Sequence, residues 1–202
     1  IVERWAAAAG GWSRLAALHG AHIKASTRES GVAGVAESWI THDGYRRSLA
    51  EGRDRSEEVR HGERCWVRDW NGKTLALQGR DRSDRVTAAF ARSLVYTGFS
   101  TELLATARAR YAGDDTSGRY HMVRLEPPHG IPLVLFLDAR SGLPARASRT
   151  PYDDAIVLTF GDWRAVAGVQ VPFDTREASG EDSGEASETV ANLVLAAREP
   201  SW

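Results

Sequence analysis

The feature that most constrains the fold of this chain is a series of short segments in which apolar and polar residues alternate, each ended by a turn signal. Two such segments between residues 21 and 40 flank Ser30-Gly31, and residues 64–70 and 73–78 flank Asn71-Gly72. Alternation with a period of two places one row of side chains on each face of a β-strand, and Asn-Gly is a strong hairpin signal. The pattern therefore predicts antiparallel strands joined by tight turns.

The last third of the sequence shows the strand pattern most clearly. Apolar segments follow one another there, with turn signals such as Pro127-Pro128-His129-Gly130 between them. A segment from Tyr45 to Leu49 after the turn signal His42-Asp43-Gly44 adds another strand, which brings the expectation to about ten strands. The strands predicted in the last third cover residues 120–126, 132–138, 143–148, 155–162, 169–177 and 188–196, with a turn over 163–168.

Other regions interrupt the alternation and predict helices. Residues 2–18 are rich in Ala and Leu but are broken by Gly10-Gly11, so we expect one or two short helices that end near residue 20. In residues 82–95, Val86, Phe90 and Leu94 recur at every fourth position, and Ser83 is the expected N-cap. Residues 101–111 predict a further short helix.

This order of elements predicts an α+β fold, with one large curved antiparallel sheet and helices on one face. A chain of 202 residues can form one large domain, and no linker or internal repeat divides it, so we expect a single domain over residues 1–202. Because the chain begins at Ile1 rather than at Met, we expect a segment excised from a longer protein, without its targeting sequence.

Composition and charge argue against several classes of function. The formal net charge of −1 gives no general attraction to nucleic acid or to anionic membranes, and no segment reaches the roughly 18 apolar residues that cross a bilayer. Cys65 is the only cysteine, so a Cys-based zinc site cannot form, and inside a strand it is expected to be a small buried apolar residue. The sequence contains no glycine-rich phosphate loop, and we expect no cofactor.

Two segments resemble the Asp-Thr/Ser-Gly triplet of aspartic peptidases, Asp115-Thr116-Ser117-Gly118 and Asp182-Ser183-Gly184. That chemistry requires one carboxylate whose pKa is raised by burial beside another, and both segments lie in polar loops, so we interpret them as turns. His19 and His22 straddle Gly20 without an acidic ligand nearby, which does not suit a metal site. We therefore predict no catalytic residue and no metal ligand.

Aromatic residues in the predicted strands admit two interpretations. They fill a core between the sheet and the helices, or they line a gap on the concave face that takes an apolar ligand. Arg68 shares a face with Trp66 and Trp70, which permits cation–π stacking or a contact at the rim of such a gap. The residues predicted to line an apolar site are Ile23, Trp39, Trp66, Trp70, Leu135 and Phe160.

The C-terminal half of the chain resembles the LolA/RseB-like domains of the outer-membrane lipoprotein-carrier type. The resemblance lies in a strand that ends in Leu137-Asp138, the turn Ser141-Gly142-Leu143-Pro144, and the segments Gly161-Asp162-Trp163-Arg164 and Val166-Ala167-Gly168-Val169. The N-terminal segment 10–18 and the segment 62–72 are similar to domains that precede retropepsin-like aspartyl peptidase domains in some bacterial secreted proteins.

The first resemblance implies an unclosed half-barrel of antiparallel strands with helices packed on its concave face, in the periplasm or outside the cell. It also implies a non-catalytic binding or accessory domain for an apolar ligand, such as a lipid or a lipoprotein acyl chain, or for a protein partner. The second resemblance implies a downstream peptidase domain as a further partner. Two alternatives stay open: a hydrolase that uses Asp115 or a His/Ser pair with His121, and a purely structural module that orients the downstream domain.

Overall fold

One antiparallel sheet contains all 13 strands of the computed structural model, which describes residues 1–41, 44–97, 107–179 and 185–196. Its strand order is β6-β5-β4-β3-β2-β1-β13-β12-β11-β10-β9-β8-β7. The strands are β1 (Gly20–Glu29), β2 (Val32–Thr41), β3 (Gly44–Glu51), β4 (Asp54–His61), β5 (Arg64–Arg68), β6 (Thr74–Ala76), β7 (Arg108–Asp114), β8 (Tyr120–Glu126), β9 (Leu133–Asp138), β10 (Pro144–Arg149), β11 (Ile156–Val166), β12 (Val169–Ser179) and β13 (Ala186–Ala196).

The order follows from hairpins between consecutive strands, with one exception. Strands β1 to β6 form one half of the sheet and β7 to β12 form the other. Strand β13 joins the two halves, because it pairs with β1 on one side (Ile23 opposite Leu193) and with β12 on the other (Asp174 opposite Thr189). The last strand of the chain therefore lies at the centre of the sheet and links its two halves.

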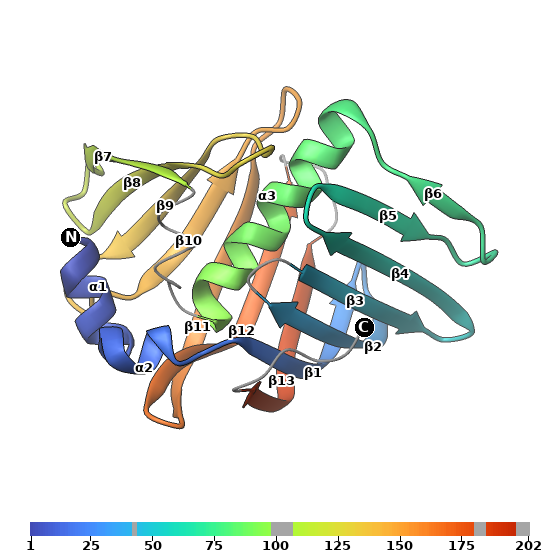
Figure 1. Cartoon of the computed structure of the whole chain (residues 1–202), viewed down its shortest axis with the longest axis horizontal. Helices are drawn as coiled ribbons and strands as arrows, with labels where there is room; N and C mark the ends of the chain where they lie inside the picture. Colours follow the sequence, from blue (N-terminus) through green and yellow to red (C-terminus); the bar gives the residue numbers. More distant parts are fainter. Residues whose placement is uncertain (42–43, 98–106, 180–184, 197–202) are drawn as a thin grey trace.

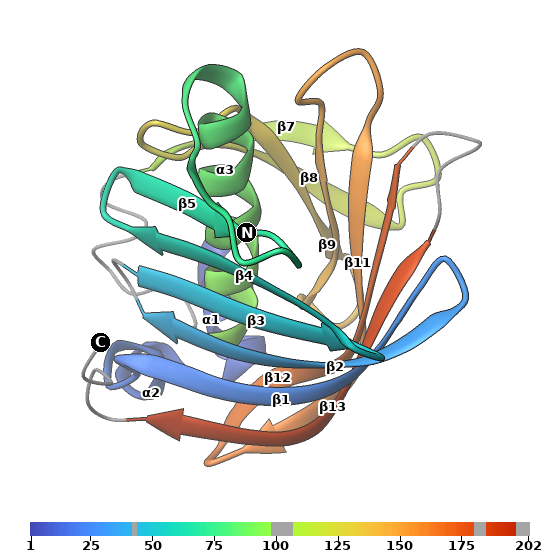
Figure 2. The same ribbon diagram turned by 90° about the vertical axis from the view of Figure 1, so that its right-hand side faces the viewer.

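The sheet is curved but not closed, and α3 (Gly79–Tyr96) lies across its concave face (Figure 1). Figure 2 shows both halves curving around this helix. The helix contacts β2, β4 and β5 in one half and β10 and β12 in the other. The predicted half-barrel with helices on the concave face is thus confirmed.

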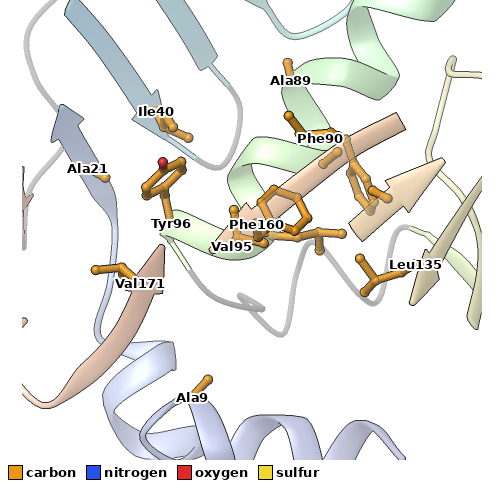
Figure 3. Packing of buried hydrophobic residues seen from close by; sticks show 14 of the residues in the cluster. Ala9, Ala21, Ile40, Ala89, Phe90, Val95, Tyr96, Leu135, Phe160 and Val171 are labelled. Atoms are coloured by element: carbon orange, nitrogen blue, oxygen red, sulfur yellow. The ribbon is translucent and has the colours of Figure 1, made fainter. Parts of the chain in front are cut away.

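The core lies between α3 and the sheet. Phe90, Leu94 and Tyr96 of the helix are buried against residues from both halves, including Ile40 and Phe160 (Figure 3). The repeat of apolar residues at every fourth position gives α3 a continuous apolar face, and the curved sheet buries it.

Two short helices precede the sheet. They are α1 (Val2–Ala9) and α2 (Trp12–Ala16), and they confirm the expected break at Gly10-Gly11. Gly10 has a φ of +125°, and a Cβ atom at this position would clash with the carbonyl oxygen of Gly168 in the β11–β12 turn. Only glycine lets the chain turn this close to another backbone. No helix among the described residues is long and apolar enough to span a membrane.

Two predictions about local structure are wrong. Ser83 is not an N-cap, because α3 begins at Gly79 and the Ser83 hydroxyl instead donates a hydrogen bond to the Gly79 carbonyl. The predicted helix over 101–111 is a strand where it is described, since Arg108–Asp114 forms β7; residues 101–106 lie outside the described part. Pairing with β8 decides this segment, because tertiary hydrogen bonds override a weak local helix preference.

The charged strand β4 was not predicted, and β11 is longer than expected. Val59 is the single apolar residue in β4, so the sequence of this strand shows no alternation of apolar and polar residues. Its strand structure comes from pairing with β3 on one side and β5 on the other. In β11 the strand continues to Val166, and the turn predicted over 163–168 shrinks to Ala167-Gly168, where both residues have positive φ.

The hairpin predicted at Asn71-Gly72 is present, and the Asp69 carboxylate organises it by accepting hydrogen bonds from the backbone N–H groups of Asn71 and Lys73. The turn signal His42-Asp43 falls outside the described residues.

Candidate functional site

A polar cavity of about 250 Å³ lies between α3 and the concave face of the sheet. Four residues of α3, at positions i, i+3, i+4 and i+7, line its helix wall: Arg85, Ala88, Ala89 and Arg92. The two alanines leave the space open, because a long side chain at either position would reach the sheet. The sheet contributes mainly polar and charged side chains from β1, β3, β4, β12 and β13, among them Thr27, Arg47, Glu58, Thr175, Glu177 and Glu188.

Glu188 of β13 is the centre of an ion-pair network at the floor of the cavity. One of its carboxylate oxygens accepts a hydrogen bond from Arg92 Nη1 of α3 at 2.9 Å, and the other accepts one from Arg47 Nε of β3 at 2.9 Å. The side chains of Arg92 and Glu188 are only 13% and 12% exposed. The helix, the first half of the sheet and the central strand therefore meet on one buried carboxylate.

The network continues into the second half of the sheet. Arg92 Nη2 lies 3.7 Å from Glu177 Oε2 of β12, and Glu177 Oε1 accepts a hydrogen bond from Arg149 of β10 at 3.1 Å. Arg149, which is 5% exposed, also donates from Nε to Asp84 Oδ1 of α3 at 2.6 Å. Guanidinium and carboxylate groups thus alternate from β3 to β10 under α3, and the charges of Arg47, Arg92 and Arg149 balance those of Asp84, Glu177 and Glu188.

The pKa values of these groups follow from burial and opposite charges. Burial by itself would raise the pKa of Glu188, but the positive charges of Arg92 and Arg47 outweigh it and lower the pKa to about 2. For Glu177, Arg149 and Arg92 likewise outweigh burial and lower the pKa. These carboxylates therefore remain ionised at neutral pH, so the network offers charge and hydrogen bonds.

The apolar part of the concave face is almost completely filled. Trp5 of α1 closes over Val123, Leu125, Leu135 and Leu137 of β8 and β9, and the remaining apolar cavity measures about 10 Å³. That is about the volume needed for a single water molecule, and far below the 300–1,000 Å³ of common ligand pockets. The apolar pocket under Trp5 therefore has no room for a ligand in this conformation.

The structure places the six predicted lining residues on different surfaces. Ile23, Leu135 and Phe160 are buried in the core under α3 and α1, with exposed fractions of 5%, 1% and 5%. Trp70 lies in the β5–β6 turn and is 68% exposed.

Trp39 and Trp66 lie on the convex face. Trp39 pairs across the strands with His22 and Arg46, Arg46 pairs with Val59, and Val59 pairs with Trp66, so all five share one row. Arg47, the next residue on β3, points to the concave face, where it contacts Glu188.

The Trp39 ring stacks on His22, with the ring centroids 3.6 Å apart. Only Ile23, Leu135 and Phe160 are therefore brought together, and the apolar lining stays a prediction.

Of the candidates for catalysis, Asp115 lies in the β7–β8 turn and His121 lies near the start of β8. Asp115 accepts hydrogen bonds from the Ser117 hydroxyl and the Tyr120 backbone, and these bonds lower its pKa, as expected of a turn carboxylate. His121 Nδ1 bonds Asp114 Oδ1 at 2.6 Å, a pair that lies outside both cavities described above. Asp182-Ser183-Gly184 falls outside the described residues.

Cys65 is buried, and burial raises the pKa of its thiol, which disfavours the nucleophilic thiolate. Within the described ranges no group of three or more His, Cys, Asp or Glu side chains is arranged to hold a metal ion.

Sequence reasoning missed the residues of the ion-pair network. The signal that points to them is a charge at an inward position of an alternating strand. Arg47 lies between Tyr45 and Leu49, and Glu188 stands two residues before Val190, so both occupy the buried row of their strands. Which arginine meets which glutamate depends on β13 returning to β1, and the sequence carries no sign of that pairing.

No protein-family model matches the sequence, and no curated protein matches it significantly. Solved structures do match over nearly the whole chain. A LolA superfamily protein from Nitrosomonas europaea aligns with 7% identity and a TM-score of 0.59, covering 96% of this chain and 92% of its own.

Two further structures align equally well. One is a domain from Vibrio parahaemolyticus named for outer membrane lipoprotein sorting, and the other is a DUF1329 family protein from Desulfovibrio piger. Each shares 12% identity and a TM-score of 0.57, with 96% of this chain and 91% of the other covered. The fold is thus the LolA-like half-barrel that the resemblance of the C-terminal half implies, while the resemblance to regions preceding aspartyl peptidases stays a prediction.

Proposed function

We propose that this chain is a non-catalytic binding domain of an exported bacterial protein, and that it receives a segment of a protein partner in the polar cavity beside α3. Its fold is shared with a domain named for outer membrane lipoprotein sorting, which supports a binding role outside the cytoplasm. At such low identity the fold alone is shared, so the choice of partner is argued from the cavity.

The observation that carries the proposal is the chemistry of the cavity wall. The space of about 250 Å³ is lined by Arg47, Glu58, Arg85, Arg92 and Glu177, together with hydroxyl groups of β1 and β12. A hydrocarbon chain placed there would strip water from charged groups and return no hydrogen bonds. A peptide segment has both donors and acceptors, and therefore matches a wall on which both charges alternate.

An apolar ligand is the second candidate, and it is favoured by the buried residues of β8 and β9. Val123, Leu125, Leu135 and Leu137 form a continuous apolar wall under Trp5 of α1. An acyl chain reaches this wall only if α1 moves away, because the remaining volume is about 10 Å³. Binding of this kind would displace Trp5, whereas binding in the polar cavity would leave it in place.

Three probes separate the candidates: a diacylated lipoprotein-type peptide, the same peptide without acyl chains, and palmitate, each titrated by calorimetry. We expect both peptides to bind, and Ala88→Leu, which fills the polar cavity, to weaken both at least tenfold. Ala7→Leu on the exposed side of α1 is the matched control and should leave binding unchanged. Binding of palmitate alone, unaffected by Ala88→Leu, would contradict the proposal and support acyl-chain carriage.

A further inference from the structure

A second hollow lies on the opposite, convex face of the sheet. It has a volume of about 630 Å³ and spans β1 to β5. Small side chains form its floor, because β3 presents Ser48 and Ala50 there while β2 presents Val35, which is 60% exposed. Longer charged side chains surround the floor: Lys24, Glu37, Arg46, Arg55, Glu57 and Arg68. We call this surface the convex groove.

The convex groove carries an excess of positive charge. Its four cationic side chains face two carboxylates, and both carboxylates are already engaged. Glu37 Oε1 bonds His22 at 2.7 Å and lies 3.4 Å from Lys24 Nζ. Glu57 Oε1 accepts a hydrogen bond from Arg46 Nε at 2.6 Å.

Arg55 and Arg68 are left without an acidic partner among the described residues. Arg68 stands directly across the strands from Glu57, but that carboxylate is bonded to Arg46. Neither guanidinium stacks on a described aromatic ring, which includes Trp66 and Trp70 beside Arg68. Two exposed guanidinium groups on the rim of one hollow attract an anionic partner.

The positions of Arg55 and Arg68 on the sheet select the shape of that partner. Arg55 lies two residues before Glu57 on β4, so it is the diagonal neighbour of Arg68 on the same face. The backbone Cα atoms of diagonal neighbours of this kind are about 7–8 Å apart. In an extended peptide, side chains at positions i and i+2 point the same way and are separated by about 7 Å. Two carboxylates at alternate positions therefore match Arg55 and Arg68.

We propose that the convex groove binds an extended acidic segment of a protein partner, with alternate carboxylates on Arg55 and Arg68. The two glutamates on the rim disfavour a uniformly anionic surface such as a lipid bilayer, since they repel it. The small residues of the floor leave room for the peptide backbone. This site is on the opposite face from the cavity beside α3, and the proposal does not depend on the function proposed above.

Fluorescence anisotropy with a labelled peptide of four Glu-Ser repeats tests the proposal. We expect the double variant Arg55→Gln/Arg68→Gln to bind the Glu-Ser peptide at least tenfold more weakly than the unmodified chain does. A Gln-Ser peptide of the same length should bind neither form of the protein. Arg110→Gln is the matched control, because it removes one exposed arginine from β7 at the far edge of the sheet. Arg55 and Arg68 are both exposed, and circular dichroism verifies that the double variant retains the fold.

A variant of opposite sign separates binding from structural effects. Glu57→Gln frees Arg46 and removes a repelling charge, so it should tighten peptide binding, which loss of structure would not do. Unchanged peptide affinity in the Arg55/Arg68 double variant would overturn the proposal. So would binding to phosphatidylglycerol vesicles that requires both arginines while the peptide fails to bind. Ala88→Leu should leave peptide binding here intact, so this test and that of the cavity fail independently.

Discussion

At the scale of single residues, the unusual feature of this protein is a buried carboxylate that serves two guanidinium groups. Glu188 accepts from Arg47 and Arg92, which come from different elements. A complete buried ion pair adds little to the stability of the fold, because the cost of desolvation offsets the attraction between the charges. Removing one partner is destabilising, because it leaves a buried charge without a counter-charge. We therefore expect the network to affect stability most clearly when one of its members is removed.

Glu188→Gln should destabilise the fold by about 3–5 kcal/mol at neutral pH, because Arg47 and Arg92 lose their shared counter-charge. Urea unfolding followed by tryptophan fluorescence measures this change. Glu126→Gln, which breaks only ion pairs with the exposed side chains of Arg110 and Arg124, is the control and should change stability by less than about 1 kcal/mol. Equal losses of unfolding free energy in the two variants would show that the buried network contributes no more to stability than an exposed ion pair.

The same substitution predicts a change in the acid response. The pKa of Glu188 is lowered from 4.5 to about 2 in the folded protein, so its ionised form stabilises the fold above the unfolded pKa. This contribution falls away as the pH decreases from about 4.5 toward 2. Glu188→Gln should therefore flatten the stability profile in that window, and a profile with unchanged slope would contradict the assignment.

At the scale of elements, the position of α1 depends on close backbone contacts as well as on apolar packing. Gly10 sits against the β11–β12 turn, and Arg4 Nη2 donates to the carbonyl oxygens of Ala139 and Arg140 in the β9–β10 turn. These contacts hold Trp5 over the apolar wall of β8 and β9. The N-terminal helix thus determines whether that wall is accessible.

Gly10→Ala should destabilise the protein more than Gly11→Ala, although both positions have positive φ. An alanine at Gly11 meets nothing within 4 Å and carries only backbone strain of about 1–3 kcal/mol, whereas at Gly10 its Cβ also clashes with Gly168. We expect a further loss of at least about 1 kcal/mol from this overpacking. Thermal unfolding of the two variants makes the comparison, and equal losses would argue against close packing of the turn.

At the scale of the whole molecule, the two halves of one sheet meet at β13, and we call its pairings with β1 and β12 the central seam. Strand β13 pairs on both sides, with β1 and β12, while β6 and β7 form the free edges. The first half contributes Arg47, the second contributes Arg149 and Glu177, and α3 contributes Arg92 and Asp84 between them. Because the network spans both halves, loss of the seam would open the polar cavity.

Hydrogen exchange should reveal this organisation. Amides in the middle of β1 and β13 are expected to exchange most slowly, because opening them requires separation of the two halves. Those of β6, whose side chains are all exposed and which pairs only with β5, should exchange fastest among the strands. Mass spectrometry after peptic digestion resolves the two regions, and faster exchange in β13 than in β6 would rule out a central seam.

Sequence reasoning correctly predicted the strands of the last third, the hairpin at Asn71-Gly72, the long helix and the curved sheet with helices on one face. Those features depend on local period and turn chemistry, which act between residues close in the chain. The same reasoning failed for β4 and β7, whose strand state comes from neighbouring strands rather than from their own alternation.

Long-range strand pairing decides which buried side chains meet and which surfaces remain open. Trp39 and Trp66 follow the same alternation as core residues, yet register places them on the convex face. Arg47 and Glu188 are separated by 141 positions and meet because β13 returns to the centre of the sheet. Alternation specifies that a strand has two faces, but long-range pairing decides which face is enclosed, and so which charges are buried together.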